Sequence, residues 1–172
     1  MAFFLLIPFF LIRFGLLAVL NQNALPRAAH FPPLQGQERA AYWIYQLSNT
    51  AVILLPLLLH VRTQPSSLFF TGAALYAAGL FLLTVSVANF AAPSGSGVNQ
   101  SGLYRLSRNP MYVSYFLVFL GCSLLTQSRL LLGLILVFQI SAHWIILAEE
   151  RWCAGQFGEA YLQYKRQVRR YL

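Results

Sequence analysis

Two clusters of polar residues interrupt a mostly apolar chain of 172 residues. The first covers residues 102–112 and carries Arg105 and Arg108, and the second is the pair Glu149-Glu150. The chain has no Asp and only four Glu, so half of its carboxylates stand in this pair. A guanidinium binds carboxylate or phosphate, and a carboxylate binds a cation or accepts a proton. The two clusters therefore hold most of the chemistry that this sequence permits.

The Glu pair has two readings from the residues alone. Side chains of adjacent helical residues point about 100° apart, so only one of the two carboxylates is expected to face inward. The pair either bonds Arg105, Arg108 or Arg151 at a membrane surface, or one Glu binds a cation or ribose hydroxyls inside a pocket. Both readings stay open at this point.

Composition indicates that the clusters are positioned by helices in a bilayer. Hydrophobic residues make up 58% of the chain and charged residues 9%, against about 25% charged residues in soluble domains. We predict an all-α integral membrane protein, a single domain over residues 1–172, with about five transmembrane helices. The expected spans are residues 2–20, 40–60, 68–91, 110–126 and 130–148. The first is expected to be a retained span rather than a cleaved signal peptide.

The connector between the fourth and fifth spans predicts that the two polar clusters meet. Only Gln127-Ser128-Arg129 separates these spans, so they should be antiparallel neighbours. Pro110 suits the first turn of the fourth helix, where its missing N–H costs nothing. The amides at that helix start, with Arg105 and Arg108 nearby, favour an anionic group.

The basic residues predict the orientation, because Lys and Arg favour the cytoplasmic side. With the C-terminus in the cytosol and the N-terminus outside, nine basic residues are cytoplasmic, and Arg62 and Arg129 lie opposite. Arg13 falls within the first span, where it must reach the interface, find a partner or line a polar cavity. Phe157, Tyr161, Tyr164 and Val168 follow a helical spacing, which predicts a C-terminal amphipathic interfacial helix.

The order and spacing of these motifs resemble the isoprenylcysteine carboxyl methyltransferase and phospholipid N-methyltransferase superfamily, in a bacterial-type member. The resemblance covers about residues 100–172, and residues 1–100, with three expected spans, match in hydrophobicity and position only. It implies S-adenosylmethionine as cofactor, a membrane-embedded active site, and a lipophilic acceptor that enters from the bilayer. The family's cofactor-binding elements fall on Arg108, Asn109, Pro110, Tyr112, Glu149, Glu150, Phe157, Tyr161 and Tyr164.

One departure from the family pattern, and several residues added to the candidate site, refine this expectation. Asn109 stands where eukaryotic members have His, so an acid or base role at that position is not expected. Tyr104, Tyr112 or Tyr161 could hold a sulfonium by their faces, and Arg105 adds to the cofactor-binding set. A carboxylate acceptor would pair with Arg105 or Arg108, whereas an amine acceptor needs a base such as Glu149 or Glu150. The catalytic candidates are Arg108, Glu149 and Glu150.

The predicted function is therefore an S-adenosylmethionine-dependent membrane methyltransferase. It would act at the cytosolic face on a carboxylate or amine of an isoprenoid, lipid or other hydrophobic molecule, in a bacterial inner membrane. The alternatives are an NADPH-dependent sterol-type reductase and a non-catalytic lipid-binding protein of the same fold, which Asn109 alone hints at. Beyond membrane lipids and the acceptor, neither a nucleic acid nor a protein partner is predicted.

Several other residues have plainer interpretations. His30, His60 and His143 are scattered along the chain, so no metal site is predicted, although His143 could either line the pocket or be structural. Cys122 and Cys153 are expected at different membrane depths, which disfavours a disulfide. The segment 95–97 is expected to be a hinge rather than a phosphate loop.

Overall fold

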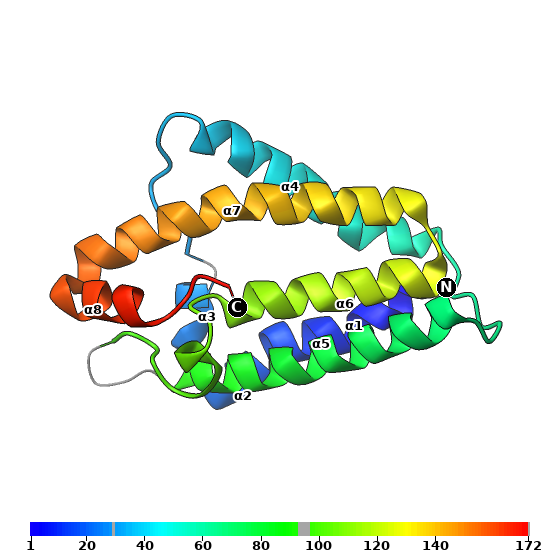
Figure 1. Ribbon diagram of the computed structural model, residues 1–172, viewed down its shortest axis with the longest axis horizontal. Coiled ribbons are helices and arrows are strands. Elements are labelled where there is room, and N and C mark those ends of the chain that lie inside the picture. Colours follow the sequence, from blue (N-terminus) through cyan, green and yellow to red (C-terminus); the bar gives the residue numbers. More distant parts are fainter. Residues whose placement is uncertain (29, 93–96, 172) are drawn as a thin grey trace.

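The computed structural model describes residues 1–28, 30–92 and 97–171, and these fold into helices joined by short loops (Figure 1). Among them there is no strand, and a lone bridge pairs Ser107 with Arg169. The predicted all-α architecture is confirmed. The polar segment at 95–96, part of the expected hinge, lies outside the described residues.

The first helix covers residues 2–20 and changes its winding three times along its length. It is 3₁₀-helical at η1 (Ala2–Leu5), α-helical at α1 (Leu6–Phe10), π-helical at η2 (Leu11–Leu16) and α-helical again at α2 (Leu17–Leu20). Pro8 lies in α1 and removes one backbone donor, which is consistent with the irregular start. The π turn contains Arg13, and single π turns within helices are frequent at functional sites.

The other spans predicted from the sequence correspond to helices that begin near the expected positions. After the short α3 (Ala24–Ala28) come α4 (Glu38–Leu54) with its 3₁₀ extension η3 (Leu55–Leu57), then α5 (Ser67–Ala91) and the 3₁₀ turn η4 (Gly102–Arg105). They are followed by α6 (Pro110–Thr126), α7 (Arg129–Phe157) and α8 (Glu159–Gln167). Pro110 is the first residue of α6, as predicted.

Local signals explain the sharp turn between α6 and α7. Gln127 takes a left-handed conformation with φ 51°, which ends α6. The hydroxyl oxygen of Ser128 then accepts the backbone N–H of Leu131 at 3.2 Å and caps α7. The two helices are therefore antiparallel, as the short connector predicts.

Each arm of this hairpin nevertheless packs mainly on another helix. α6 lies along α5, and α7 lies along α4 (Figure 1). Glycines allow the α5–α6 contact, because a Cβ at Gly79 would lie 2.6 Å from the backbone N of Val118, and one at Gly121 would lie 2.7 Å from that of Tyr76. The hairpin arms can thus stay apart at the end remote from Gln127, where the polar clusters lie.

Within the described residues, three helices are long and apolar enough to cross a bilayer, namely 2–20, 67–91 and 129–157, and the apolar α6 is shorter. The chain is thus an integral membrane protein, and the count of five crossings stays a prediction. α7 runs past the predicted end at residue 148 to Phe157. Its 29 residues extend about 43 Å, more than the roughly 30 Å of hydrocarbon. Its last turns can therefore carry Glu149 and Glu150 beyond the apolar core.

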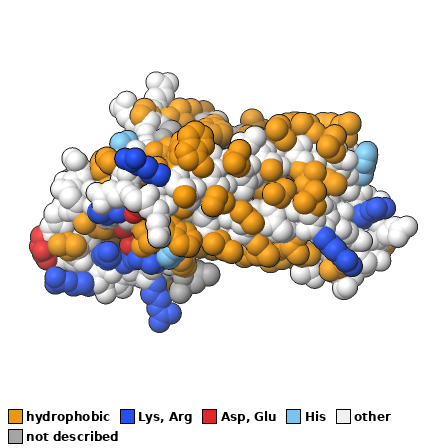
Figure 2. Space-filling view, turned by 90° about the horizontal axis from the view of Figure 1, so that it is seen from above, with side chains coloured by type: hydrophobic (Ala, Val, Ile, Leu, Met, Phe, Trp, Pro, Cys, Tyr) orange, Lys and Arg blue, Asp and Glu red, His pale blue; other side chains and the backbone are white. Residues whose placement is uncertain are grey.

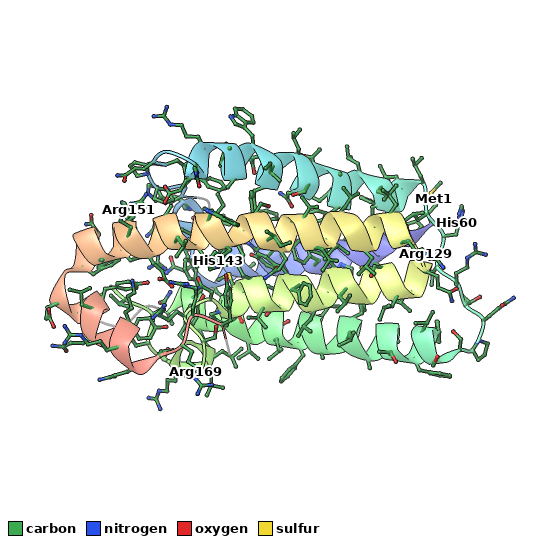
Figure 3. The ribbon with its side chains drawn as sticks, turned by 45° about the horizontal axis from the view of Figure 1, so that its top comes forward. Met1, His60, Arg129, His143, Arg151 and Arg169 are labelled. Carbon is green, nitrogen blue, oxygen red and sulfur yellow. The ribbon has the colours of Figure 1, made fainter. Side chains whose placement is uncertain are left out.

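Charged side chains gather toward the two ends of the molecule, and hydrophobic side chains cover the surface between them (Figure 2). Met1, His60 and Arg129 lie together at one end, while Arg151 and Arg169 lie toward the other (Figure 3). We call the second the site end, because the polar clusters meet there. Cys122 and Cys153 are both free thiols, in agreement with the sequence.

Candidate functional site

A cavity of about 680 Å³ lies at the site end of the bundle. Its wall comes from the first helix, α3, residues 30–32, α4, the end of α5 and residues 97–99 on one part, and from η4, residues 108–109, α6, α7 and α8 on the other. Ligand sites typically measure about 300–1,000 Å³ and have mostly apolar walls with a few polar groups. This cavity has that size and character, since aromatic side chains dominate its wall.

The aromatic wall belongs to two hydrophobic clusters. Phe9, Tyr45, Phe119 and Phe138 belong to the main core, and ring contacts at centroid distances of 5.0–5.8 Å connect them across the bundle. Val98, Tyr161, Tyr164 and Phe157 belong to a second cluster under α8. One continuous cavity thus contacts both the membrane core and the covering helix.

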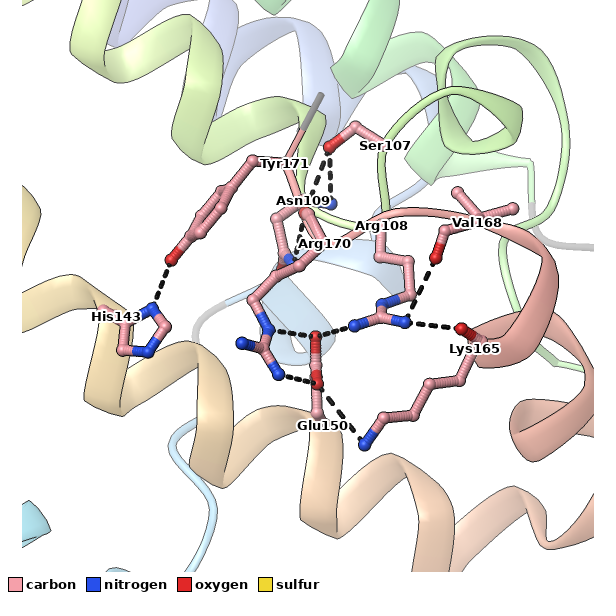
Figure 4. Close-up of polar contacts among 9 residues, drawn as sticks. All are labelled: Ser107, Arg108, Asn109, His143, Glu150, Lys165, Val168, Arg170 and Tyr171. Carbon is pink, nitrogen blue, oxygen red and sulfur yellow. Dashed lines mark hydrogen bonds and ion pairs between the residues drawn. The ribbon is translucent and has the colours of Figure 1, made fainter.

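Glu150 is the centre of an ion cluster at the edge of this cavity (Figure 4). Arg108 donates to it at 2.8 Å, Arg170 donates two hydrogen bonds at 2.9 and 3.0 Å, and the ammonium of Lys165 lies 3.6 Å away. The Glu150 side chain is only 4% exposed. Because three cations face one carboxylate, the cluster as a whole is positive and favours an anionic ligand group.

The C-terminal segment is attached to the start of α6 by backbone and side-chain hydrogen bonds (Figure 4). The backbone N–H of Arg108 donates to the carbonyl of Arg169 at 2.9 Å, and the Asn109 amide donates to the carbonyl of Arg170 at 3.1 Å. Tyr171 pairs with His143 at 2.8 Å. His143 thus holds the C-terminal segment and is not on the cavity wall.

Glu149 lies on a different part of the wall, and its hydrogen-bond partner is a neutral hydroxyl. The Tyr112 hydroxyl donates to it at 3.0 Å, and Tyr112 in turn contacts the ring of Tyr115 at 5.9 Å between centroids. Both Glu149 and Glu150 reach the cavity. The two carboxylates have different surroundings, because Glu150 is matched by cations and Glu149 by a phenol.

α8 closes the cavity with its aromatic face, as the helical spacing predicts. Tyr161 and Tyr164 are buried, and the Tyr164 hydroxyl donates to the carbonyl of Tyr104 at 2.8 Å. Phe157 packs over Gly97, where an added Cβ would lie 2.9 Å from the ring and φ is +77°. A side chain at Gly97 would therefore displace Phe157 from the wall.

The surroundings of these side chains determine which of them are charged and which are neutral. The hydrogen bond to Glu150 raises the pKa of Arg170 further above its ordinary value, so Arg170 stays charged. Burial raises the pKa of Tyr161 and Tyr164 above the ordinary value of 10.0. The tyrosines therefore act as neutral rings and hydroxyls at any physiological pH.

The structure brings most of the predicted site residues to one cavity and leaves two elsewhere. Arg105 is exposed and is absent from the cavity wall, and Pro110 is buried in the first turn of α6 behind it. The others on the wall are Tyr104, Arg108, Asn109, Tyr112, Glu149, Glu150, Phe157, Tyr161 and Tyr164. Arg151 bonds Glu38 at 2.6 and 2.7 Å rather than either member of the Glu pair.

Other wall residues were not singled out by the sequence. Asn49 reaches the cavity from α4 and Asn99 from the segment before η4, and Arg170 completes the ion cluster. A lone amide in an apolar run could have pointed to Asn49. The sequence places Arg170 in the segment that carries the family resemblance and among the cytoplasmic charges, but it assigns no site role to it. The contact of Arg170 with Glu150 depends on the return of the chain after α8.

Three buried polar atoms on the wall have no hydrogen-bond partner among the described residues. They are Oδ1 of Asn99, Nε of Arg108 and Nη1 of Arg13. Buried polar atoms nearly always have partners, so such exceptions require an explanation. Bound polar groups would satisfy all three. The described residues hold no group of three or more His, Cys, Asp or Glu that could bind a metal ion.

Comparisons with known proteins give one match. Residues 69–160 match the phospholipid methyltransferase family, and this range runs from the first turn of α5 through α6 and α7 into α8. No curated protein and no solved structure matches the chain. The matched range exceeds half of the chain and contains both polar clusters of the cavity. The chain therefore belongs to the phospholipid methyltransferase family.

Proposed function

We propose that this protein uses S-adenosylmethionine to methylate a lipophilic acceptor at the cytosolic face of the membrane. The supporting observation is that one continuous cavity contacts the positive ion cluster under α8 and the aromatic core of the bundle. A water-soluble cofactor and an apolar acceptor could meet in such a space. Family membership supports the methyltransferase class.

The residues on the polar part of the wall fit this cofactor. Arg108 and Asn99 each hold an unsatisfied buried polar atom, which a polar ligand would pair. The faces of Tyr104, Tyr161 and Phe157 suit a sulfonium and an adenine ring. We assign cofactor binding to these residues together with Asn109, Tyr112 and Tyr164. When bound, the cofactor supplies an electrophilic methyl group.

The two carboxylates would have different roles. Glu150 is matched by three cations, so it is suited to orient Arg108 and Arg170 and not to accept a proton. Glu149 has the Tyr112 hydroxyl as its hydrogen-bond partner and reaches the same cavity, so it is suited to take the proton of an amine acceptor. An acceptor carboxylate would need no base. The barrier would fall mainly through alignment and exclusion of water by α8.

The basic residues support an orientation with the site end in the cytosol. Lys165, Arg166 and Arg169 are exposed there, whereas Arg129 lies at the opposite end beside His60 (Figure 3), and Arg62 lines a pocket with that His60. This asymmetry follows the positive-inside rule. We propose that the N-terminus is outside and that the protein resides in a bacterial inner membrane.

Calorimetric titration tests the cofactor. Purified protein in dodecyl maltoside is mixed separately with S-adenosylmethionine, S-adenosylhomocysteine and NADPH. Micromolar binding of the two sulfur nucleosides is expected, and Glu150→Gln and Tyr112→Ala should abolish it. Arg129→Ala, at the far end, is the control and should bind normally. Binding of NADPH alone would overturn the proposal in favour of a reductase, and binding of no nucleotide would favour a non-catalytic protein.

The acceptor class needs a separate assay. Membranes containing the protein are incubated with methyl-tritiated S-adenosylmethionine, and the lipid extract is then treated with mild base. Methyl esters release volatile methanol, whereas N-methyl groups stay with the lipid. Glu149→Gln should abolish labelling if the acceptor is an amine and spare most of it if the acceptor is a carboxylate.

A further inference from the structure

Arg13 is a cation placed within the apolar part of the first helix. It lies in the π turn η2, seven residues before Leu20, the helix end nearest the cavity. At 1.5 Å per residue this depth is about 10 Å. Charged residues at such depth are rare and usually face a partner or a polar cavity. Arg13 lines the cavity described above.

The partners of Arg13 within the protein leave its charge unmatched. One nitrogen, Nη2, donates to the carbonyl of Ala28 at 2.8 Å, and the guanidinium lies 5.6 and 6.0 Å from the ring centroids of Phe14 and Tyr115. The other terminal nitrogen, Nη1, is buried and has no partner among the described residues. These contacts support a cation but do not neutralise it.

No described carboxylate forms an ion pair with Arg13. Glu150 is held by Arg108, Lys165 and Arg170, and Glu38 by Arg151. Glu149 accepts a hydrogen bond from Tyr112 and lies more than 4.0 Å from the Arg13 guanidinium. A charge without an ion partner at this depth is costly. A simple structural role, holding the Ala28 carbonyl, would use one N–H donor of the five that a guanidinium carries.

We propose that Arg13 binds the anionic group, a carboxylate or a phosphate, of the lipophilic methyl acceptor. This inference rests on the proposed function and adds a specificity-determining residue outside the matched range 69–160. Phe9, Phe119 and Phe138 lie on the same wall and belong to the main core, so they suit the acceptor's apolar chain. A guanidinium binds both anions through paired hydrogen bonds.

Glu149 lies on the same wall, and two tyrosines connect it to Arg13. Tyr115 faces the Arg13 guanidinium, Tyr112 contacts Tyr115, and the Tyr112 hydroxyl donates to Glu149. The anion of the acceptor would therefore be held near the proposed base but apart from it. Arg13 determines specificity in this scheme, so neutral lipids of equal chain length should bind poorly.

Ligand-induced thermal stabilisation in dodecyl maltoside tests the inference. The probes are oleate and dioleoylphosphatidate, with oleyl alcohol and diolein as their neutral counterparts. For the wild type, the half-maximal shift in Tm is expected at a concentration at least about tenfold lower for one anion than for its neutral counterpart. The pair that shows this gap identifies carboxylate or phosphate. Arg13→Gln should remove the gap, and Arg129→Gln, the control, should keep it.

Binding of S-adenosylhomocysteine separates the two proposals. It should be unchanged in Arg13→Gln. If the wild type binds it but shows no preference for either anion, or if Arg13→Gln keeps the preference, the role of Arg13 is refuted and the proposed function stands. If the wild type does not bind it, the proposed function fails and Arg13 holds no methyl acceptor. If Arg13→Gln does not fold, the preference for an anion over its neutral counterpart is measured for the wild type and for Arg13→Lys instead, and these two results decide.

Discussion

The substitution Glu150→Gln should lower both the stability of the protein and its affinity for a nucleotide ligand. It removes the charge that faces Arg108, whose side chain is 8% exposed. Breaking a buried ion pair by neutralising one partner costs about 3–5 kcal/mol. Arg108 keeps two carbonyl acceptors, those of Lys165 at 2.7 Å and Val168 at 3.1 Å. We therefore expect a loss near the lower limit, about 3 kcal/mol.

Arg170 and Lys165 should add little to this loss. Their side chains are 29% and 42% exposed, so water can solvate their charges when the carboxylate is neutralised. For a chain of this length, 1 kcal/mol corresponds to about 2–4 °C in Tm. The expected decrease is then about 6–12 °C, measured by intrinsic fluorescence during heating in detergent.

A double-mutant cycle tests whether the Arg108–Glu150 contact is the cause. Arg108→Met with Glu150→Gln should cost less than the sum of the single substitutions by more than about 1 kcal/mol, because the second change removes the unpaired charge. Arg129→Gln serves as the control for loss of an exposed charge at the far end. Additive single effects, or a Tm within about 2 °C of wild type for Glu150→Gln, would refute this reasoning.

Three further results are expected. Gly79→Ala or Gly121→Ala should lower the free energy of unfolding by about 1–3 kcal/mol in denaturation, because an added Cβ would lie within 2.7 Å of backbone atoms in the α5–α6 contact. Gly133→Ala is the control and should be neutral or stabilising, because nothing lies within 4 Å of its added Cβ. Tyr112→Phe should weaken methyl transfer more than cofactor affinity, because it removes the hydroxyl on Glu149; equal losses would contradict that role. The Arg151 hydrogen bond holds the pKa of Glu38 below 4.5, so its stabilisation, present at pH 7, should be lost as pH falls below about 4.5. The Tm gap between wild type and Glu38→Gln should therefore shrink there, and a constant gap would contradict it.

Several features of the fold could be predicted from the sequence because they depend on local patterns. Apolar runs of the right length predict the helices, Gln127-Ser128-Arg129 predicts the turn, and Pro110 predicts the start of α6. The meeting of the two polar clusters follows from the antiparallel hairpin alone. The helical spacing of Tyr161 and Tyr164 predicts the buried face of α8.

Other features depend on contacts between distant segments, which local patterns do not encode. The sequence placed the end of the fifth span at 148, because hydropathy falls there, but α7 continues to Phe157, where Gly158 with φ +54° ends it. Packing of α6 on α5 and of α7 on α4 keeps the hairpin arms apart. The cavity between them, with Asn49 and Asn99 on its wall, results from that separation.

The sequence by itself determined the bilayer environment, the helices and the family of this protein, since these follow from composition, periodicity and local motifs. The tertiary structure decided how the charges pair. It joined Glu150 to Arg170, Arg151 to Glu38, and left Arg13 without a carboxylate among the described residues. Charge alone makes any of these pairs possible, and only the three-dimensional path of the chain selects among them.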